Sequence, residues 1–167
     1  LDFLDPQSIV PYGSLFLPDP SIGRWAQWRA QVGSANFSLI GQIHTLSTPA
    51  SMRLLQELVT EPVKPWDAVV CSSNAGKTVV EKVMNDREEQ LFNRLHINDY
   101  KVVDRPYLPV IPLPIATQQI RDELPDKQSA RKKLDLDLNS HVVLWLGRLS
   151  MLTKADPWPT YVALQKA

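Results

Sequence analysis

Short apolar runs alternate with helix-like segments along most of this chain, and that alternation limits the fold more than any other feature of the sequence. The apolar runs hold few polar residues, which is typical of strands buried on both faces of a sheet. The segments between them repeat apolar residues at spacings of three and four, which indicates helices. Strands joined through helices form parallel βαβ units. The sequence therefore predicts an α/β fold in which helices flank a parallel sheet.

The predicted elements begin at about residue 14. Pro49 suits the first position of a helix, and Ser73 or Asn74 can cap the amino end of the next one. Prolines interrupt the stretch that follows this second helix, so we expect that stretch to be an edge strand or a connector between domains. Strands are predicted at 14–17, 37–43, 67–71 and 107–113, and helices at 23–32, 49–61 and 74–95.

A polar stretch separates the predicted elements above from a last apolar run. The apolar run at 141–146 predicts a fully buried strand that ends at Gly147, and a helix is expected from about Asp156. Both ends of the chain fall inside this pattern, which predicts that the chain is a fragment. Before this run, the polar residues 116–127 are expected to be a linker, and a short helix is expected at 129–136.

Charge and cysteine content exclude several classes of function. The chain has 18 Lys and Arg against 18 Asp and Glu, so its net charge of zero gives no support to nucleic acid as a partner. The single cysteine, Cys71, excludes an intrachain disulfide and a cysteine-based metal cluster. We expect a cytoplasmic protein, because a lone cysteine suits a reducing compartment. No apolar run approaches the roughly 18 residues of a transmembrane helix.

Ligands of open parallel sheets bind beyond the carboxyl ends of the strands, and two predicted strands end in polar residues. His44 follows the strand at 37–43, where it can bond a ligand or act as an acid or base, or merely cap the strand. After the next strand, Gly76-Lys77-Thr78 matches the end of a phosphate-binding P-loop, but Cys71 stands where the P-loop needs its first glycine. A capped helix start is therefore favoured there over a P-loop.

A third candidate site follows the apolar run at 141–146. Gly147 allows a ligand to approach the backbone, and Arg148 comes directly after it. Lys154 and the start of a predicted helix follow. Two cations beside a helix amino end suit a diphosphate, although an arginine such as Arg148 is also typical of a surface ion pair.

Together these segments resemble the large family 4 of retaining, nucleotide-sugar-dependent glycosyltransferases, which have the GT-B fold of two Rossmann-like domains. The resemblance covers roughly residues 14–167. It implies that residues 1–115 are the C-terminal part of the N-terminal, acceptor-side domain, that 116–137 connect the two domains, and that 138–167 are the truncated start of the donor domain. Four segments carry it in the family's order: His44-Thr45-Leu46-Ser47, Trp66-Asp67-Ala68-Val69-Val70-Cys71-Ser72-Ser73, Val110-Ile111-Pro112-Leu113-Pro114-Ile115 and Val143-Leu144-Trp145-Leu146-Gly147-Arg148-Leu149-Ser150.

The resemblance implies a transferase that moves a sugar from a nucleotide-sugar donor to an unidentified acceptor. It implies that His44 is a catalytic residue in contact with the transferred sugar, and that Arg148 and Lys154 bind the donor diphosphate. No metal and no cofactor is expected, because the two cations stabilise the departing nucleotide. The resemblance also leaves open a peripheral membrane contact in the full-length protein.

The chain departs from the family pattern at several positions. Pro114 and Ala116 stand where the family usually has glycine and aspartate, and Lys154 lies one position further from Arg148 than is common. The family's glycine-rich loop and glutamate motif do not occur in these residues, so the chain alone is expected to be inactive. Two alternatives stay open: a P-loop nucleotide phosphatase or kinase that uses Lys77, Thr78 and magnesium, and a non-catalytic Rossmann-like interaction module.

Overall fold

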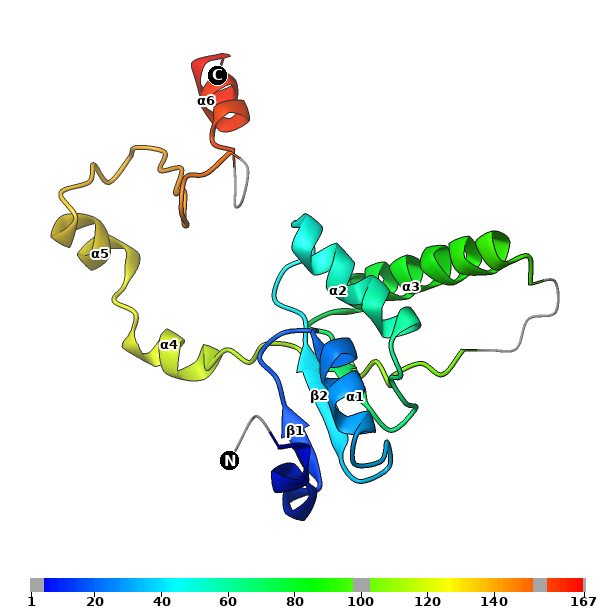
Figure 1. Ribbon diagram of the computed structural model, residues 1–167. Helices are drawn as coiled ribbons and strands as arrows, with labels where there is room; N and C mark the ends of the chain where they lie inside the picture. The colour runs from blue at the N-terminus through cyan, green and yellow to red at the C-terminus, as the bar shows by residue number, and fades with distance from the viewer. Residues whose placement is uncertain (1–4, 98–102, 152–155, 167) are drawn as a thin grey trace. The chain divides into compact units, whose positions relative to one another are not determined.

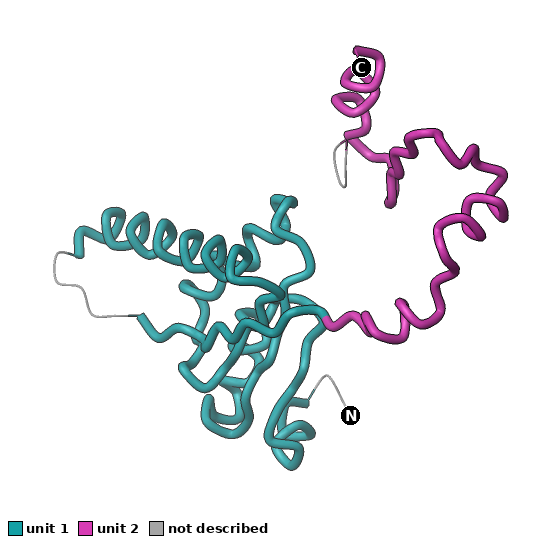
Figure 2. The backbone as a smooth tube through the Cα atoms, turned by 180° about the vertical axis from the view of Figure 1, so that it is seen from behind, with its two compact units in different colours: residues 1–113 teal, residues 114–167 magenta. Residues whose placement is uncertain are grey.

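The computed structural model describes residues 5–97, 103–151 and 156–166. The chain divides into two compact units, unit 1 (Leu1–Leu113) and unit 2 (Pro114–Ala167), which Figure 2 shows in different colours. Unit 1 contains a parallel sheet with helices, and unit 2 contains short helices joined by extended chain. The structure is therefore mixed α/β, with its sheet in unit 1.

Three parallel strands in chain order form the sheet of unit 1 (Figure 1). In the register, Leu15 lies opposite Leu39, and Ile40 lies opposite Ala68. A fourth segment continues the sheet beyond the third strand, since Tyr107 forms a parallel bridge with Ala68. The predicted parallel arrangement of four segments is confirmed. The strands are β1 (Ser14–Phe16), β2 (Ser38–Gln42) and β3 (Ala68–Val70).

Proline prevents the fourth segment from forming a continuous strand. The carbonyl oxygens of Tyr107 and Pro109 accept from the backbone N–H groups of Val69 and Cys71, both at 2.9 Å. The Ile111 N–H donates back to the Cys71 carbonyl at 2.9 Å. Between these bonds, Pro109 has no N–H to donate, so the ladder is interrupted halfway along. The segment is the edge of the sheet, as the prolines predict.

Three helices cover one face of the sheet (Figure 1). The first packs against β2 and the second helix, and the second packs against the third. Right-handed crossovers between strands in chain order place all three helices on the same side. Accordingly, Leu39 and Gly41 of β2 are buried, whereas Ile40 between them is only half-buried. The helices are α1 (Ile22–Ala30), α2 (Pro49–Thr60) and α3 (Asn74–Leu95).

Capping residues explain where the two longer helices begin. The Thr48 hydroxyl oxygen accepts from the Ser51 N–H at 3.2 Å, and Pro49 occupies the first position of α2. The Ser73 hydroxyl oxygen accepts from the Gly76 N–H at 3.0 Å at the start of α3. Each cap satisfies an N–H group that has no partner inside the helix. The structure thus selects Ser73, rather than Asn74, as the cap.

A 3₁₀ helix that the sequence did not indicate precedes β1 at Pro6–Tyr12.

Unit 2 differs from the sequence-based expectation. A helix lies within residues 116–127, which were expected to be a linker, and the following helix begins and ends earlier than the predicted 129–136. No described residue of unit 2 is buried. The polar composition of the helix at 117–123 explains why an apolar pattern did not reveal it. The helices are α4 (Thr117–Glu123), α5 (Lys127–Lys133) and α6 (Trp158–Lys166).

The fully buried strand predicted at 141–146 is wrong. These residues form no strand, and the exposed fractions of Leu144 and Leu146 are 78% and 91%. A buried parallel strand requires neighbouring strands that pair with its backbone and helices that cover both faces. The described residues of unit 2 contain no strand that could pair with 141–146. An apolar run is therefore not sufficient for a buried strand in this unit.

Candidate functional site

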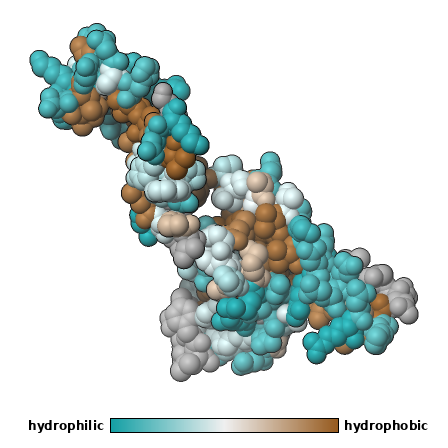
Figure 3. Space-filling model, turned by 90° about the horizontal axis from the view of Figure 1, so that it is seen from above, coloured by the Kyte–Doolittle hydropathy of each residue, from teal (hydrophilic) through white to brown (hydrophobic). Residues whose placement is uncertain are grey.

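The carboxyl end of the sheet in unit 1 contains the candidate site. A cavity of about 280 Å³ opens there, between the chain that leaves β2 and the first turns of α3. Figure 3 looks down on this end of the sheet and shows hydrophobic side chains gathered on the surface of unit 1. The cavity joins two segments that the sequence indicated separately. Its lining residues are Ile43, His44, Thr45, Leu46, Ser72, Ser73, Ala75, Gly76 and Val79.

His44 is the titratable residue in the lining of this cavity. Its side chain is exposed, and its Nε2 atom lies 3.3 Å from the amide nitrogen of Gln42. When that amide donates to Nε2, the neutral ring carries its proton on Nδ1. His44 also lines a second cavity of about 120 Å³, together with Val70 and Ile111. The imidazole is therefore placed where it can donate a hydrogen bond to a ligand at the end of the sheet.

Close packing explains the glycine at the start of α3. Gly76 is buried, and a Cβ atom at this position would lie 3.0 Å from Cδ1 of Ile43. Ile43 immediately follows β2, so the missing side chain allows α3 to pack closely on the end of that strand. The match to a P-loop suggested that Gly76 binds phosphate, but its position is explained by contact between the helix and the sheet.

The segment at 71–78 does not form a phosphate-binding loop. Because α3 begins at Asn74, Gly76 and Lys77 lie in the helix, and their N–H groups donate to the side chain and the carbonyl of Ser73. The Thr78 hydroxyl donates to the Asn74 carbonyl at 3.1 Å. A P-loop instead presents free N–H groups from a loop before its helix. The predicted capped helix start is confirmed.

Lys77 lies on the first turn of α3 and is half-buried. The exposed fraction of its side chain is 37%, and its ammonium group lies 3.7 Å from the carboxylate of Glu81. This spacing of four residues along a helix is typical of a surface ion pair. The Lys77 charge is therefore held along the side of α3.

Cys71 lies beneath the candidate site and is not a nucleophile in this state. Its side chain is fully buried, with the sulfur 3.6 Å from the Val69 carbonyl. Burial raises the pKa of the Cys71 thiol, while the nearby Lys77 charge opposes this shift and Glu81 adds to it. The reactive form of cysteine is the thiolate. Near neutral pH, Cys71 therefore contributes to the core as a neutral thiol.

The residues predicted to bind a diphosphate belong to unit 2. Arg148 is exposed, and it follows Gly147, whose φ of +143° is rarely adopted by residues with a side chain. Glycine is therefore suited to this turn. Lys154 lies outside the described residues. His44 belongs to unit 1, so the structure assigns the predicted site residues to separate units.

A buried ion pair between Arg29 and Asp67 was not anticipated from the sequence. Both side chains are fully buried, and two guanidinium nitrogens donate to the two carboxylate oxygens, Nη2 to Oδ2 at 2.8 Å. The Asp67 carboxylate also accepts from the backbone N–H groups of Leu39 and Lys64 at 2.9 and 2.8 Å. The Arg29 guanidinium donates to the Phe37 carbonyl at 2.8 Å. The pair joins α1 to the amino ends of β2 and β3, opposite the candidate site.

One sequence signal could have revealed this pair. Arg29 lies seven residues after Ile22 and three after Ala26, so it continues the buried stripe of α1. A charged residue on such a stripe requires a buried partner of opposite charge. The sequence alone does not identify that partner, which lies 38 residues away.

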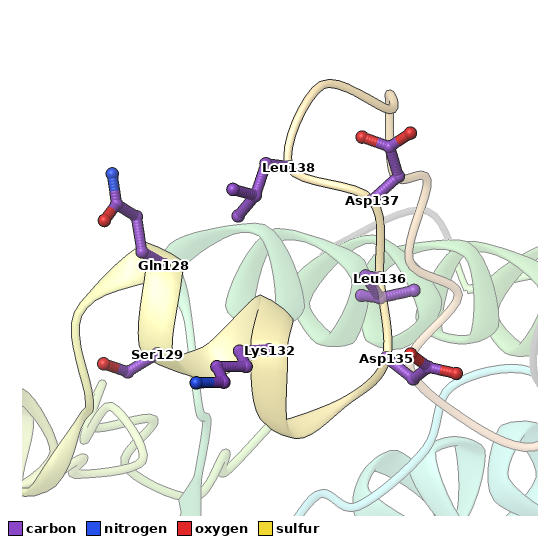
Figure 4. A pocket seen from close by; sticks show the side chains of 7 residues that line it. All are labelled: Gln128, Ser129, Lys132, Asp135, Leu136, Asp137 and Leu138. Atoms are coloured by element: carbon purple, nitrogen blue, oxygen red, sulfur yellow. The ribbon is translucent and has the colours of Figure 1, made fainter.

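Unit 2 contains a cavity of about 520 Å³ beside α5. Figure 4 shows that Gln128, Ser129 and Lys132 reach it from the helix, whereas Asp135 and Asp137 belong to the chain that follows. Every side chain that lines it is exposed, and the Ser129 hydroxyl is already bonded to Asp126 at 2.6 Å. This cavity is an open surface depression, so it is a weaker candidate than the end of the sheet.

The part of the chain described by the structure contains no cluster of three or more His, Cys, Asp or Glu side chains that could hold a metal ion. Within the same residues, none of the helices combines the length and the apolar character required to cross a bilayer. Comparison with protein-family models, with curated proteins and with solved structures finds no match for this chain.

Proposed function

We propose that this chain forms part of a retaining glycosyltransferase that transfers a sugar from a nucleotide-sugar donor to an acceptor. The observation that supports this function best is the cavity at the carboxyl end of the parallel sheet, which brings His44 together with the amino end of α3. Ligands of Rossmann-like folds bind at this end. The hydroxyl groups of Thr45, Ser72 and Ser73 add hydrogen-bonding groups for a polar ligand.

In this proposal, unit 1 is the acceptor-side domain, residues 116–137 connect it to a donor domain, and residues 138–167 contribute to that domain. His44 donates a hydrogen bond to the transferred sugar. Arg148 and Lys154 bind the diphosphate and neutralise the charge that grows on the departing nucleotide, so no metal ion is required. The reaction takes place in the cytoplasm, and the full-length protein can contact a membrane surface that carries the acceptor. The chain by itself is inactive.

The first test concerns Arg148 in the full-length protein. A charge-assisted hydrogen bond contributes about 1.5–3 kcal/mol, and about 1.4 kcal/mol corresponds to tenfold in rate. We therefore expect Arg148→Ala to lower turnover with nucleotide sugars by about one to two orders of magnitude. The measurements are sugar transfer and calorimetric binding of the nucleotide diphosphate. Arg121→Ala is the control, since Arg121 is also exposed in unit 2. If Arg148→Ala leaves both quantities unchanged, the proposed donor site is rejected.

The second test separates the roles of the two units. We expect His44→Ala to slow sugar transfer but to retain binding of the nucleotide diphosphate, because His44 contacts the sugar and not the phosphates. His141→Ala is the matched control, since this histidine is exposed in unit 2. Loss of nucleotide binding in His44→Ala, or unchanged transfer, would contradict the role proposed for His44.

A further inference from the structure

A further cavity of unit 1, lined by residues of two helices and the chain before them, carries a different chemistry. It has a volume of about 480 Å³ and lies between α1 and α2. We call it the tryptophan groove. None of the residues around it lines the cavity at His44. The tryptophan groove is lined by Asp19, Ser21, Arg24, Trp25, Trp28 and Leu54.

Two indole rings form a corner in this groove. The ring centroids of Trp25 and Trp28 lie 5.2 Å apart, and the ring planes meet at 88°. Both side chains are half-buried, so their inner edges pack on the core while other parts of the rings line the cavity. Because the core holds both rings, they present rigid apolar surface to a ligand at little cost in side-chain entropy.

Charged groups of both signs lie beside the indoles. One carboxylate oxygen of Asp19 accepts from the Ser21 N–H at 2.8 Å, which orients the carboxylate and leaves it further acceptor capacity. The Arg24 side chain is 70% exposed and lies 3.3 Å from the Glu57 carboxylate. Its guanidinium has five N–H donors, of which this contact uses only some. The groove thus combines apolar ring surface with one acceptor and one donor group.

The backbone places the tryptophan groove beside the candidate site. Asp19 follows β1, and its carbonyl oxygen accepts from the N–H of Gln42 at 3.3 Å. Gln42 is the last residue of β2, and its side chain contacts His44. The Asp19 end of the groove therefore lies at the end of the sheet where ligands of such sheets bind, and the groove extends along α1 to Trp28, which contacts Phe37 before β2.

We propose that the tryptophan groove binds a pyranose ring of a saccharide. A pyranose has apolar C–H faces, which suit the indoles, and a rim of hydroxyl groups, which suit Asp19 and Arg24. A purely apolar ligand would remove water from Asp19 and Arg24 without replacing the hydrogen bonds of that water. A phosphate would be repelled by the negative charge of the Asp19 carboxylate. This inference names a saccharide as the acceptor class and rests on the proposed function for that role, whereas sugar binding itself does not depend on it.

The test is a nuclear magnetic resonance titration of the 167-residue chain, which has five tryptophans with indole N–H signals. The probes are cellobiose, methyl α-mannopyranoside and, as an apolar ring of similar size, cyclohexanol. We expect the saccharides to shift the Trp25 and Trp28 signals while the Trp66 signal stays in place. Absence of such shifts with both saccharides, or equal shifts with cyclohexanol, would overturn the proposal.

Two variants locate the binding. Asp19→Asn keeps an oxygen for the Ser21 N–H but removes the charge, and we expect it to weaken saccharide affinity by about tenfold or more. Trp66→Phe is the control, because Trp66 lines a separate cavity with Gly13 and Phe37, and affinity should be unchanged. Unchanged affinity in Asp19→Asn would overturn the assignment. If saccharides shift the signals but the full-length protein transfers no sugar, saccharide binding in the groove is supported and the proposed function is rejected. If the full-length protein transfers sugar but no signals shift, the proposed function is supported and saccharide binding in the groove is rejected.

Discussion

At the scale of single residues, the buried ion pair between Arg29 and Asp67 links several elements of unit 1. The two side chains are fully buried, and the carboxylate also binds the backbone N–H groups of Leu39 and Lys64. Removing one partner leaves a charge without compensation in the core. The pair therefore ties together α1, β2 and the chain that enters β3, and it holds these elements in one arrangement.

We expect Arg29→Met to reduce the free energy of unfolding by about 3–5 kcal/mol, because Asp67 would keep a buried charge without its partner. Urea unfolding followed by circular dichroism measures this change. The control is Arg24→Met, which breaks a pair with Glu57 whose arginine is 70% exposed, and its cost should stay within about 1 kcal/mol. Equal losses in the two variants would contradict the role assigned to the buried pair.

The thiol of Cys71 predicts a dependence of stability on pH. Burial raises its pKa in the folded state, so the folded protein retains the proton at pH values where the unfolded chain loses it. The contribution of Cys71 to stability is therefore complete below the unfolded pKa of about 8.5 and is lost as pH rises through the folded pKa. In urea unfolding at increasing alkaline pH, we expect wild type to lose more stability than Cys71→Ala. Parallel curves for the two proteins would refute this.

Which residues could be identified from the sequence depended on how local their signals are. His44 could be identified because it comes just after a predicted strand, and Ser73 because it comes just before a predicted helix. The Arg29–Asp67 pair and the tryptophan groove join residues that are far apart in the chain. Their geometry is determined by how α1 packs against its neighbours, which no local pattern specifies.

At the scale of elements, Gly41 controls how closely the start of α1 approaches β2. A Cβ atom at this position would lie 2.7 Å from the Asp19 carbonyl oxygen and 2.9 Å from Cγ2 of Ile22. The first of these atoms belongs to the backbone and cannot rotate away. Gly41 is therefore required by close packing between the strand and the chain that leads into the helix.

We expect Gly41→Ala to destabilise unit 1 by about 1–3 kcal/mol or more, as overpacking of a core does. The thermal unfolding midpoint measures the effect. Ser38→Ala, at a half-buried position of the same strand, should change the midpoint much less. A Gly41→Ala protein as stable as Ser38→Ala would show that the backbone near Asp19 can move aside. Because Asp19 lines the tryptophan groove, the same substitution should also weaken saccharide binding.

The two longer helices of unit 1 were predicted well because each carries its own start signal. The observed α2 and α3 match the predicted ranges 49–61 and 74–95 closely, since Pro49 and Ser73 define their amino ends. The apolar run at 141–146 has no comparable signal. Whether such a run becomes a strand depends on partners elsewhere in the chain, and the described residues of unit 2 supply none.

At the scale of the whole molecule, the two units should differ in local stability. The core of unit 1 buries apolar side chains from its strands and helices, whereas no described residue of unit 2 is buried. Local opening requires little free energy where few apolar contacts are lost. We expect hydrogen exchange to be slowest in β2 and β3 and much faster in α4 and α5. Comparable protection in the two units, measured by mass spectrometry, would contradict this.

The order of the strands has a consequence for synthesis on the ribosome. Because β1, β2 and β3 are neighbours in chain order, each strand can pair with the one made just before it. The sheet can begin to form before the C-terminal residues are made. The core is not complete, however, until Asp67 leaves the ribosome and pairs with Arg29. We expect nascent chains arrested before β3 to be digested rapidly by protease. Chains long enough to expose the edge segment at Tyr107 should resist digestion. The strands would then join the sheet in the order in which the ribosome makes them.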